Sequence, residues 1–132
     1  AKFTVREQDL TDGNPDFYDS VGVGSYPIDL HITTKTHSFF YKPSKRFTIP
    51  LGAMIPVRIK NLIPACKNIG TTHLTGGCYR LHPVEWSVGE AAGFLASYAI
   101  DRNCEIGEVR EDGNKLNDFL DLLRENGVQT HW

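Results

Sequence analysis

The chain has 132 residues, of which 40% are apolar and 23% charged, and its formal net charge is −2. This length suffices for one compact domain with its own core, and the composition is that of an ordinary globular protein. The charge is balanced and forms no basic run, so no nucleic-acid-binding surface is indicated. No apolar stretch approaches the ~20 residues that cross a bilayer, so we expect neither nucleic acid nor membrane as a partner.

The cysteines indicate a reducing compartment. Cys66, Cys78 and Cys104 form an odd set, so at least one thiol is free or paired between chains. The first residues lack the basic-then-apolar form of a secretory signal. We therefore expect a cytoplasmic protein without a disulfide framework.

The first third of the chain reads as short strands separated by turns. Residues 2–8 predict a short strand, residues 11–16 a loop, and residues 17–23 a strand or a short helix. Residues 27–34 alternate regularly and predict a strand. One face of it carries Ile28, Leu30 and Ile32, and the other carries Asp29, His31 and Thr33.

Further short strands are expected up to residue 65. Residues 35–46, with three consecutive aromatic residues, predict a loop or hairpin. Residues 47–50, 54–59 and 61–65 predict strands, which prolines and a glycine keep short and confine to sheet edges.

Two helices follow. Pro83 suits a first helical turn, and an apolar face continues at helical spacing to about Ile100. Residues 101–113 predict a linker, and a second apolar face follows, capped by Asp112 or Asn114 and ended by Gly127. The two apolar faces comprise Val84, Val88, Ala91, Leu95 and Tyr98, then Leu116, Phe119, Leu120, Leu122 and Leu123.

This order of elements predicts an α+β fold, with short mixed or antiparallel strands followed by two C-terminal helices. Within it we distinguish three regions of one compact domain. They are residues 1–60 with the strands, residues 61–102 with a strand, a loop and a helix, and residues 103–132 with a linker and a helix.

The loop before the first long helix carries the residues best suited to chemistry. A helix start offers unpaired N–H groups and partial positive charge, and therefore favours an anion or a developing negative charge. Arg80 adds a cation three residues before Pro83, or forms a surface ion pair with Glu85 or Asp29. His73 and His82 flank the loop, and imidazole is the side chain best suited to carry a proton near neutral pH.

Two readings compete with catalysis in this loop. Cys66, His73, Cys78 and His82 contain the residue types of a Cys2His2 zinc site, although their spacings of six, four and three residues match no compact finger. The loop and helix also suit a non-enzymatic module that binds a partner protein.

The order of residue types resembles a known family. His73, Gly77, Arg80, Pro83, Gly89 and the run Glu90–Gly93 closely resemble the C-terminal segment of FAD-dependent oxidoreductases with a glutathione-reductase-like flavin fold. Residues 61–66 resemble the strand that precedes this segment in the family, and residues 25–31 resemble part of its substrate-side region. The resemblance covers most of residues 17–102.

This resemblance implies FAD as the cofactor and hydride transfer from a small organic substrate to the flavin. It places Arg80 and Gly77 beside the isoalloxazine ring, where the amides of Val84, Glu85 and Trp86 face the N1–C2=O edge. His73 and Arg80 would be catalytic. We expect the Glu85 side chain to point away from the flavin or to pair with a basic residue. The implied FAD-binding residues are Gly77, Arg80, Pro83, Val84, Glu85 and Gly89, and the implied substrate residues are Tyr26, Asp29 and His31. His82 is a further candidate substrate residue because of its place beside the loop, and not because it matches the family pattern.

The Gly-x-Gly-x-x-Gly fingerprint of a dinucleotide-binding domain is absent from the sequence. By resemblance, that domain precedes this region. We therefore expect a C-terminal fragment of a two-domain FAD-binding fold, or one partner of a split enzyme, and in either case the partner is the missing N-terminal dinucleotide-binding domain. The small residues Gly89, Gly93 and Ala96 would dock on that domain, and the isolated chain would be inactive and bind FAD poorly.

Overall fold

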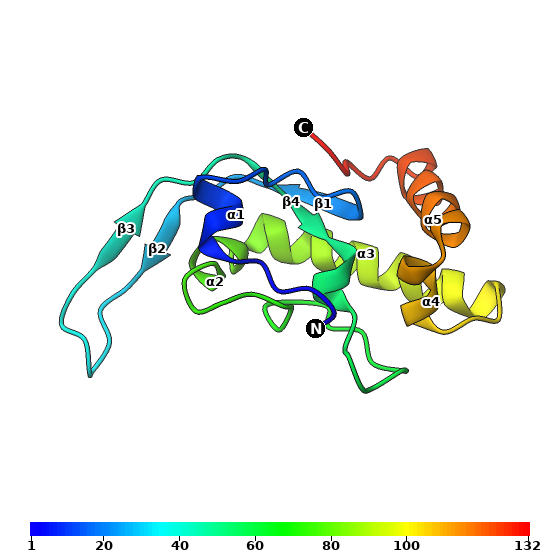
Figure 1. Cartoon of the computed structure of the whole chain (residues 1–132), viewed down its shortest axis with the longest axis horizontal. Coiled ribbons are helices and arrows are strands. Elements are labelled where there is room, and N and C mark those ends of the chain that lie inside the picture. Colours follow the sequence, from blue (N-terminus) through cyan, green and yellow to red (C-terminus); the bar gives the residue numbers. More distant parts are fainter.

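The computed structural model describes all 132 residues and has the predicted α+β fold, with small antiparallel ribbons and C-terminal helices (Figure 1). No helix is both long and apolar enough to span a membrane. In chain order the elements are α1 (Glu7–Thr11), β1 (Ser20–Gly24), β2 (Ile28–Leu30), β3 (Phe40–Lys42), β4 (Phe47–Pro50), the 3-10 helix η1 (Leu51–Met54), α2 (Gly76–Tyr79), α3 (His82–Asp101), α4 (Ile106–Glu111) and α5 (Gly113–Glu125).

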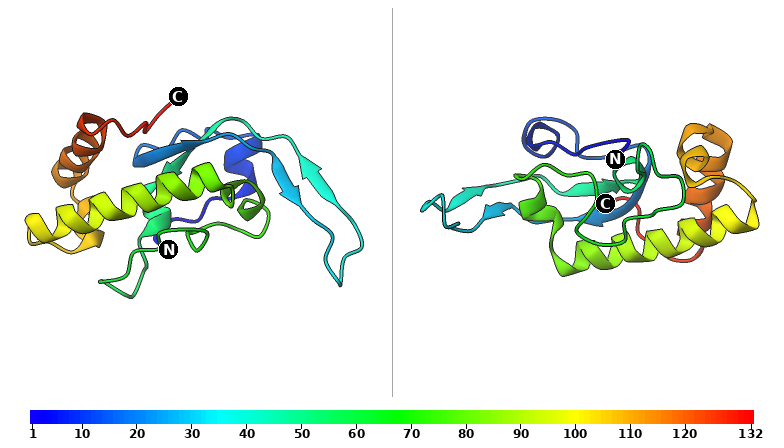
Figure 2. Two further views of the ribbon diagram at one scale, coloured as in Figure 1. Left: turned by 180° about the vertical axis from the view of Figure 1, so that it is seen from behind. Right: turned by 90° about the horizontal axis from the view of Figure 1, so that it is seen from below.

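The ribbon of β1 and β4 forms the sheet part of the core. Its antiparallel register pairs Val23 with Thr48 and Gly24 with Phe47. Gly24 must lack a side chain, because a Cβ there would collide with the Phe47 ring. The ribbon lies across α3, which buries its predicted apolar face against it (Figures 1 and 2).

The two predicted helices are confirmed as α3 and α5, but the predicted linker between them is wrong. Residues 106–111 form α4, which buries Ile106 and Val109, three residues apart and therefore on one helical face. Helices α3 and α5 meet where the Tyr98 ring of α3 packs edge-on against Phe119 of α5, with 5.5 Å between ring centroids. The side chain of Asp112 accepts hydrogen bonds from the amides of Asn114 and Lys115, so the predicted cap of α5 is Asp112.

Three predicted strands in the first half are wrong. Residues 2–8 form only one bridge, from Val5 to Thr71, and the chain then enters α1, whose start is fixed by a hydrogen bond from the Arg6 amide to the Asp9 carboxylate. Residues 51–54 form η1, and no strand follows over 54–59. Residues 61–65 form a turn and an unpaired extended segment, because no neighbouring strand lies alongside them.

The predicted hairpin is confirmed and projects from the body of the molecule (Figures 1 and 2). Its strands β2 and β3 pair Ile28 with Lys42, Asp29 with Tyr41, and Leu30 with Phe40. The expected strand over 27–34 is thus only three residues long. Every side chain from 31 to 43 is exposed, so this arm contributes little to the core.

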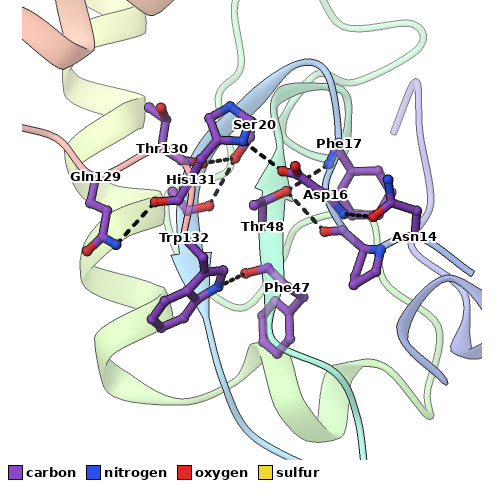
Figure 3. Close-up of polar contacts among 12 residues, drawn as sticks. Asn14, Asp16, Phe17, Ser20, Phe47, Thr48, Gln129, Thr130, His131 and Trp132 are labelled. Carbon is purple, nitrogen blue, oxygen red and sulfur yellow. Dashed lines mark hydrogen bonds and ion pairs between the residues drawn. The ribbon is translucent and has the colours of Figure 1, made fainter.

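The C-terminal tail returns to the β1–β4 ribbon (Figure 3). The Ser20 hydroxyl donates to the Thr130 carbonyl at 2.5 Å, and the Trp132 indole donates to the Phe47 carbonyl at 3.0 Å. His131 Nδ1 lies 2.7 Å from a carboxylate oxygen of Asp16. These contacts join the end of the chain to two segments near its beginning and middle.

Candidate functional site

Buried hydrogen bonds hold the loop before α3 in place. The Thr75 hydroxyl donates to the Val5 carbonyl at 2.9 Å, and the Tyr79 hydroxyl donates to the Thr48 carbonyl at 2.7 Å. The Tyr79 ring also stacks on Phe47, with 4.5 Å between centroids. Burial raises the pKa of Tyr79 well above its ordinary value, so this residue is a neutral anchor. The anchored α2 fixes the position of Arg80, the next residue.

A cleft of about 320 Å³ lies between α2 and the start of the hairpin. It brings together five residues that the sequence analysis singled out from two distant segments: Asp29, His31, His73, Gly77 and Arg80. The other lining residues are Leu30, Thr72 and Gly76, which were not among the predicted site residues. Their sequence context showed only strand alternation and turn composition, neither of which indicates a ligand site.

Asp29 is the acidic centre of the cleft wall. Its Oδ2 atom lies 3.4 Å from the Tyr26 hydroxyl, 3.4 Å from His31 Nε2 and 3.9 Å from Arg80 Nη2. Its Oδ1 atom is buried without a hydrogen-bond partner, and only 13% of the side chain is exposed. Tyr26 thus reaches the site through Asp29 and does not itself line the cleft.

Arg80 is held by one backbone oxygen of α2 and one of β2. Its Nε donates to the Gly77 carbonyl at 3.4 Å and its Nη2 donates to the Asp29 carbonyl at 3.2 Å. The predicted ion pair with Asp29 is therefore present, and the alternative pair with Glu85 is not. A guanidinium has five donors, so others remain available for a ligand.

Gly77 is explained by internal packing. A Cβ at this position would come within 2.8 Å of the Asp29 carbonyl oxygen and 3.0 Å of its amide nitrogen. The missing side chain lets α2 approach the backbone of β2, and this contact narrows the cleft. Close approach of a flavin ring is not needed to account for this glycine.

The start of α3 is free of a side-chain cap. Its N-cap residue Leu81 is apolar, and His82 and Pro83 are exposed. Glu85 pairs with Lys67, with 3.5 Å between Nζ and Oε1, as we expected for a carboxylate that leaves the helix start open. His82 lies outside the cleft and near the Trp86 ring, with 6.5 Å between centroids.

The small residues of α3 differ in their surroundings. A Cβ at Gly93 would meet no atom within 4 Å, and one at Gly89 would meet only the Ala65 carbonyl oxygen, at 3.5 Å. Trp86 and Ile100 on the same helix are 71% and 78% exposed. Part of α3 is therefore uncovered.

The structure gives no support to a zinc site. No group of three or more His, Cys, Asp or Glu residues is arranged to hold a metal ion. Cys66 is exposed, whereas Cys78 is buried and donates its thiol hydrogen to the Thr75 carbonyl. Burial raises the pKa of Cys78 to about 12, which opposes the thiolate form that zinc requires.

A larger open cleft of about 690 Å³ lies near the C-terminal end of α3. It contains none of the candidate catalytic, FAD-binding or substrate residues, although Ala96 of the small-residue stripe lines it. Two of its acidic side chains are already paired, Glu105 with Lys60 at 2.8 Å and Glu108 with Lys115 at 2.6 Å. The smaller cleft beside Arg80 is therefore the better candidate for chemistry.

The fold and the loop–helix site define an α+β domain with an open helix start next to a polar cleft. The family model described as FAD dependent oxidoreductase matches residues 1–120, so the chain belongs to that family. The resemblance to FAD-dependent oxidoreductases is thereby confirmed. Comparisons with curated proteins and with solved structures gave no match.

Proposed function

We propose that this chain is the C-terminal part of a glutathione-reductase-like flavoprotein. In this proposal it supplies the flavin-ring edge of the FAD site and part of the substrate cavity. The observation that carries the proposal is the open start of α3 directly beside the Arg80 cleft. The family match supports the general activity, and the residue order from His73 to Gly93 supports this division of labour.

The residues at the start of α3 fit an electron-rich ring edge. Leu81 offers no capping atom, and Glu85 is drawn toward Lys67. No side-chain oxygen caps the amides of the first turn, and together with the helix dipole these amides stabilise negative charge. When bound, FAD supplies the two-electron acceptor for a hydride from the substrate.

The cleft supplies groups that hold a proton or orient a substrate. His31 and His73 line it, and both imidazoles are exposed to a ligand that enters it. In our proposal one of these histidines accepts the proton that an alcohol or related substrate releases on oxidation. Arg80 orients the substrate through its free guanidinium donors.

A dinucleotide-binding domain is the proposed partner. Gly93 has open space where a side chain would lie, and Trp86 and Ile100 leave apolar surface on the same helix. Small residues let another backbone approach closely. We propose that this face of α3, with Gly89, Gly93 and Ala96, docks on that domain, which also binds the pyrophosphate and adenosine of FAD.

The reduction potential of the flavin tests the role of the helix start. In the FAD-loaded complete enzyme, His82→Asp places a carboxylate at the first residue of α3, where it favours the helix but repels negative charge on the flavin edge. We expect the two-electron midpoint potential to fall by roughly 30 mV, which corresponds to about 1.4 kcal/mol.

Two control variants separate this local effect from general effects. His82→Asn changes the same residue without adding charge, and Asn117→Asp adds one charge at an exposed position in α5. Neither should change the potential measurably. If the midpoint potential falls equally in His82→Asp and Asn117→Asp, or does not fall in His82→Asp, the start of α3 does not lie at the flavin edge and the proposal is refuted.

A further inference from the structure

The stretch of chain that supplies most of the cleft lining is rich in basic residues. Between Leu30 and Val84 the sequence has eight lysines and arginines and no aspartate or glutamate, although the whole chain is slightly acidic. Apart from Asp29, every residue that lines the cleft comes from this stretch. Of these eight residues, Arg80 lines the cleft, whereas Lys60 and Lys67 form ion pairs elsewhere. Arg80 therefore supplies the positive charge that favours an anion in the cleft.

The one carboxylate in the cleft does not cancel this preference. Asp29 directs Oδ2 toward Tyr26, His31 and Arg80, and its side chain is only 13% exposed. The side chains of Arg80 and His31 are 43% and 72% exposed. A ligand entering the cleft therefore meets cationic or proton-bearing groups, while the acidic group acts as their internal counter-ion.

Arg80 is prepared to receive an anion. Its hydrogen bonds to the Gly77 and Asp29 carbonyls fix the plane of the guanidinium before any ligand arrives. The remaining N–H donors keep the fork geometry that matches two oxygens of one carboxylate. Because the side chain is already ordered, little conformational entropy is lost on binding.

An aromatic wall, formed by Phe39 and Tyr41, lies on the face of the hairpin that carries Asp29 and His31. Tyr41 is paired with Asp29 across the ribbon, so the two side chains lie on the same face. Phe39 lies on this face too, with its ring centroid 6.3 Å from that of His31. Tyr41 and Phe39 are each 58% exposed, so the face offers apolar surface next to the cationic cleft.

We infer that the cleft binds an organic anion, with its carboxylate on Arg80 and its apolar or ring-bearing part against Phe39 and Tyr41. If the proposed function holds, this anion is the substrate, and the enzyme oxidises a hydroxy acid or a related carboxylate rather than a neutral alcohol. The identification of this anion as the substrate rests on the proposed function, whereas the binding of the anion does not.

The 132-residue chain without FAD is sufficient for the test. Its ¹H–¹⁵N NMR spectrum is recorded during titration with mandelate, which joins a carboxylate, a hydroxyl and a phenyl ring. We expect saturable shifts of the Gly76, Gly77, His31 and Tyr41 amides and of the Arg80 Nε–H. The neutral analogue 1-phenyl-1,2-ethanediol should bind at least about tenfold more weakly, because it lacks the charge-assisted contact.

Matched variants assign the binding to Arg80. We expect Arg80→Gln to weaken mandelate binding at least about tenfold and Arg80→Lys to restore part of it, because lysine keeps the charge but not the fork. Arg58→Gln removes the same charge from the same basic stretch, at an exposed position outside the cleft, and should leave binding unchanged. Dispersed spectra of each variant establish that it is folded.

Several results would overturn the inference. The first is that mandelate and the neutral diol bind with equal affinity. The second is that Arg80→Gln and Arg58→Gln lose the same amount of mandelate affinity. The third is that no chemical shift changes up to the solubility limit of mandelate. Binding of sulfate as tightly as mandelate would also overturn it, since the aromatic wall would then contribute nothing. None of these results depends on the flavin potential of the His82 variants, so the two proposals fail separately.

Discussion

Cys78 illustrates how burial changes the chemistry of a single residue. Its side chain is fully buried, its thiol donates to the Thr75 carbonyl, and its pKa is raised to about 12. Because only the thiolate is a nucleophile, we expect iodoacetamide at neutral pH to label exposed Cys66 and to leave Cys78 unmodified until the protein unfolds. Mass spectrometry of the labelled peptides measures both. Rapid labelling of Cys78 in folded protein would contradict this placement.

Asp19 is the most deeply buried carboxylate, with 1% of its surface exposed. Its Oδ2 atom lies 2.6 Å from Arg110 Nε and accepts the Gly52 amide at 2.9 Å, so the pair joins α4 to η1 and the ribbon. We expect Arg110→Met to lower the free energy of unfolding by about 3–5 kcal/mol, because it leaves a buried charge without its partner.

Urea unfolding of matched variants checks this prediction. Arg124→Met breaks an exposed pair with Asp121 and should cost less than about 1 kcal/mol. Adding Asp19→Asn to Arg110→Met should recover part of the loss, since it removes the unpaired charge. An equal loss of unfolding free energy in Arg110→Met and Arg124→Met would show that the buried pair stabilises the fold no more than the exposed pair does.

The sequence pattern of the hairpin predicted which side chains share a face, but not what those side chains contact. Alternation along residues 27–34 placed Asp29 and His31 on one face, and the structure brings both to the cleft with Arg80. The sequence contained no signal that Gly77 packs on the backbone of Asp29, because that contact depends on how α2 sits against the hairpin. The alternation of residues along a strand predicts which side chains share one face, whereas the residues that pack opposite that face depend on the tertiary structure.

Among the elements, α5 shows how one polar side chain defines a helix end. Asp112 accepts from the Asn114 amide at 2.9 Å and from the Lys115 amide at 3.3 Å. We expect Asp112→Ala to lower the free energy of unfolding by about 1 kcal/mol, because two amides lose their acceptor, and Asp112→Asn to have little effect. Thermal and urea unfolding measure both, and equal losses in the two variants would point to charge rather than capping.

The elements that the sequence predicted well are those with a long repeating pattern. The apolar faces of α3 and α5 extend over several turns, and both helices are where the pattern placed them. Helix α4 is only six residues long, with Ile106 and Val109 as its buried contacts, so its pattern was too short to detect. Residues 61–65 had strand composition, but a strand needs a neighbour, and the fold places none there.

At the scale of the whole molecule, the sheets show what this chain lacks for binding a dinucleotide. Its strands form two separate two-stranded antiparallel ribbons. A dinucleotide site of the usual kind needs a parallel sheet with a glycine-rich turn at the mouth of a helix. The missing Gly-x-Gly-x-x-Gly fingerprint agrees with this topology. The sequence could not show how the ribbons pair, because their register depends on tertiary packing.

We expect the 132-residue chain alone to bind FAD weakly, because in our proposal a dinucleotide-binding domain holds the pyrophosphate and adenosine. Titration of FAD monitored by flavin fluorescence measures this affinity. ADP, which carries only that half of the cofactor, should neither bind nor compete. Adding the dinucleotide-binding domain should raise the affinity for FAD, and Gly93→Leu on the open face of α3 should oppose that rise without unfolding the chain, because its Cβ meets no neighbour. Tight, stoichiometric FAD binding by the chain alone would show that the cofactor site is complete within these residues and that no partner domain is required.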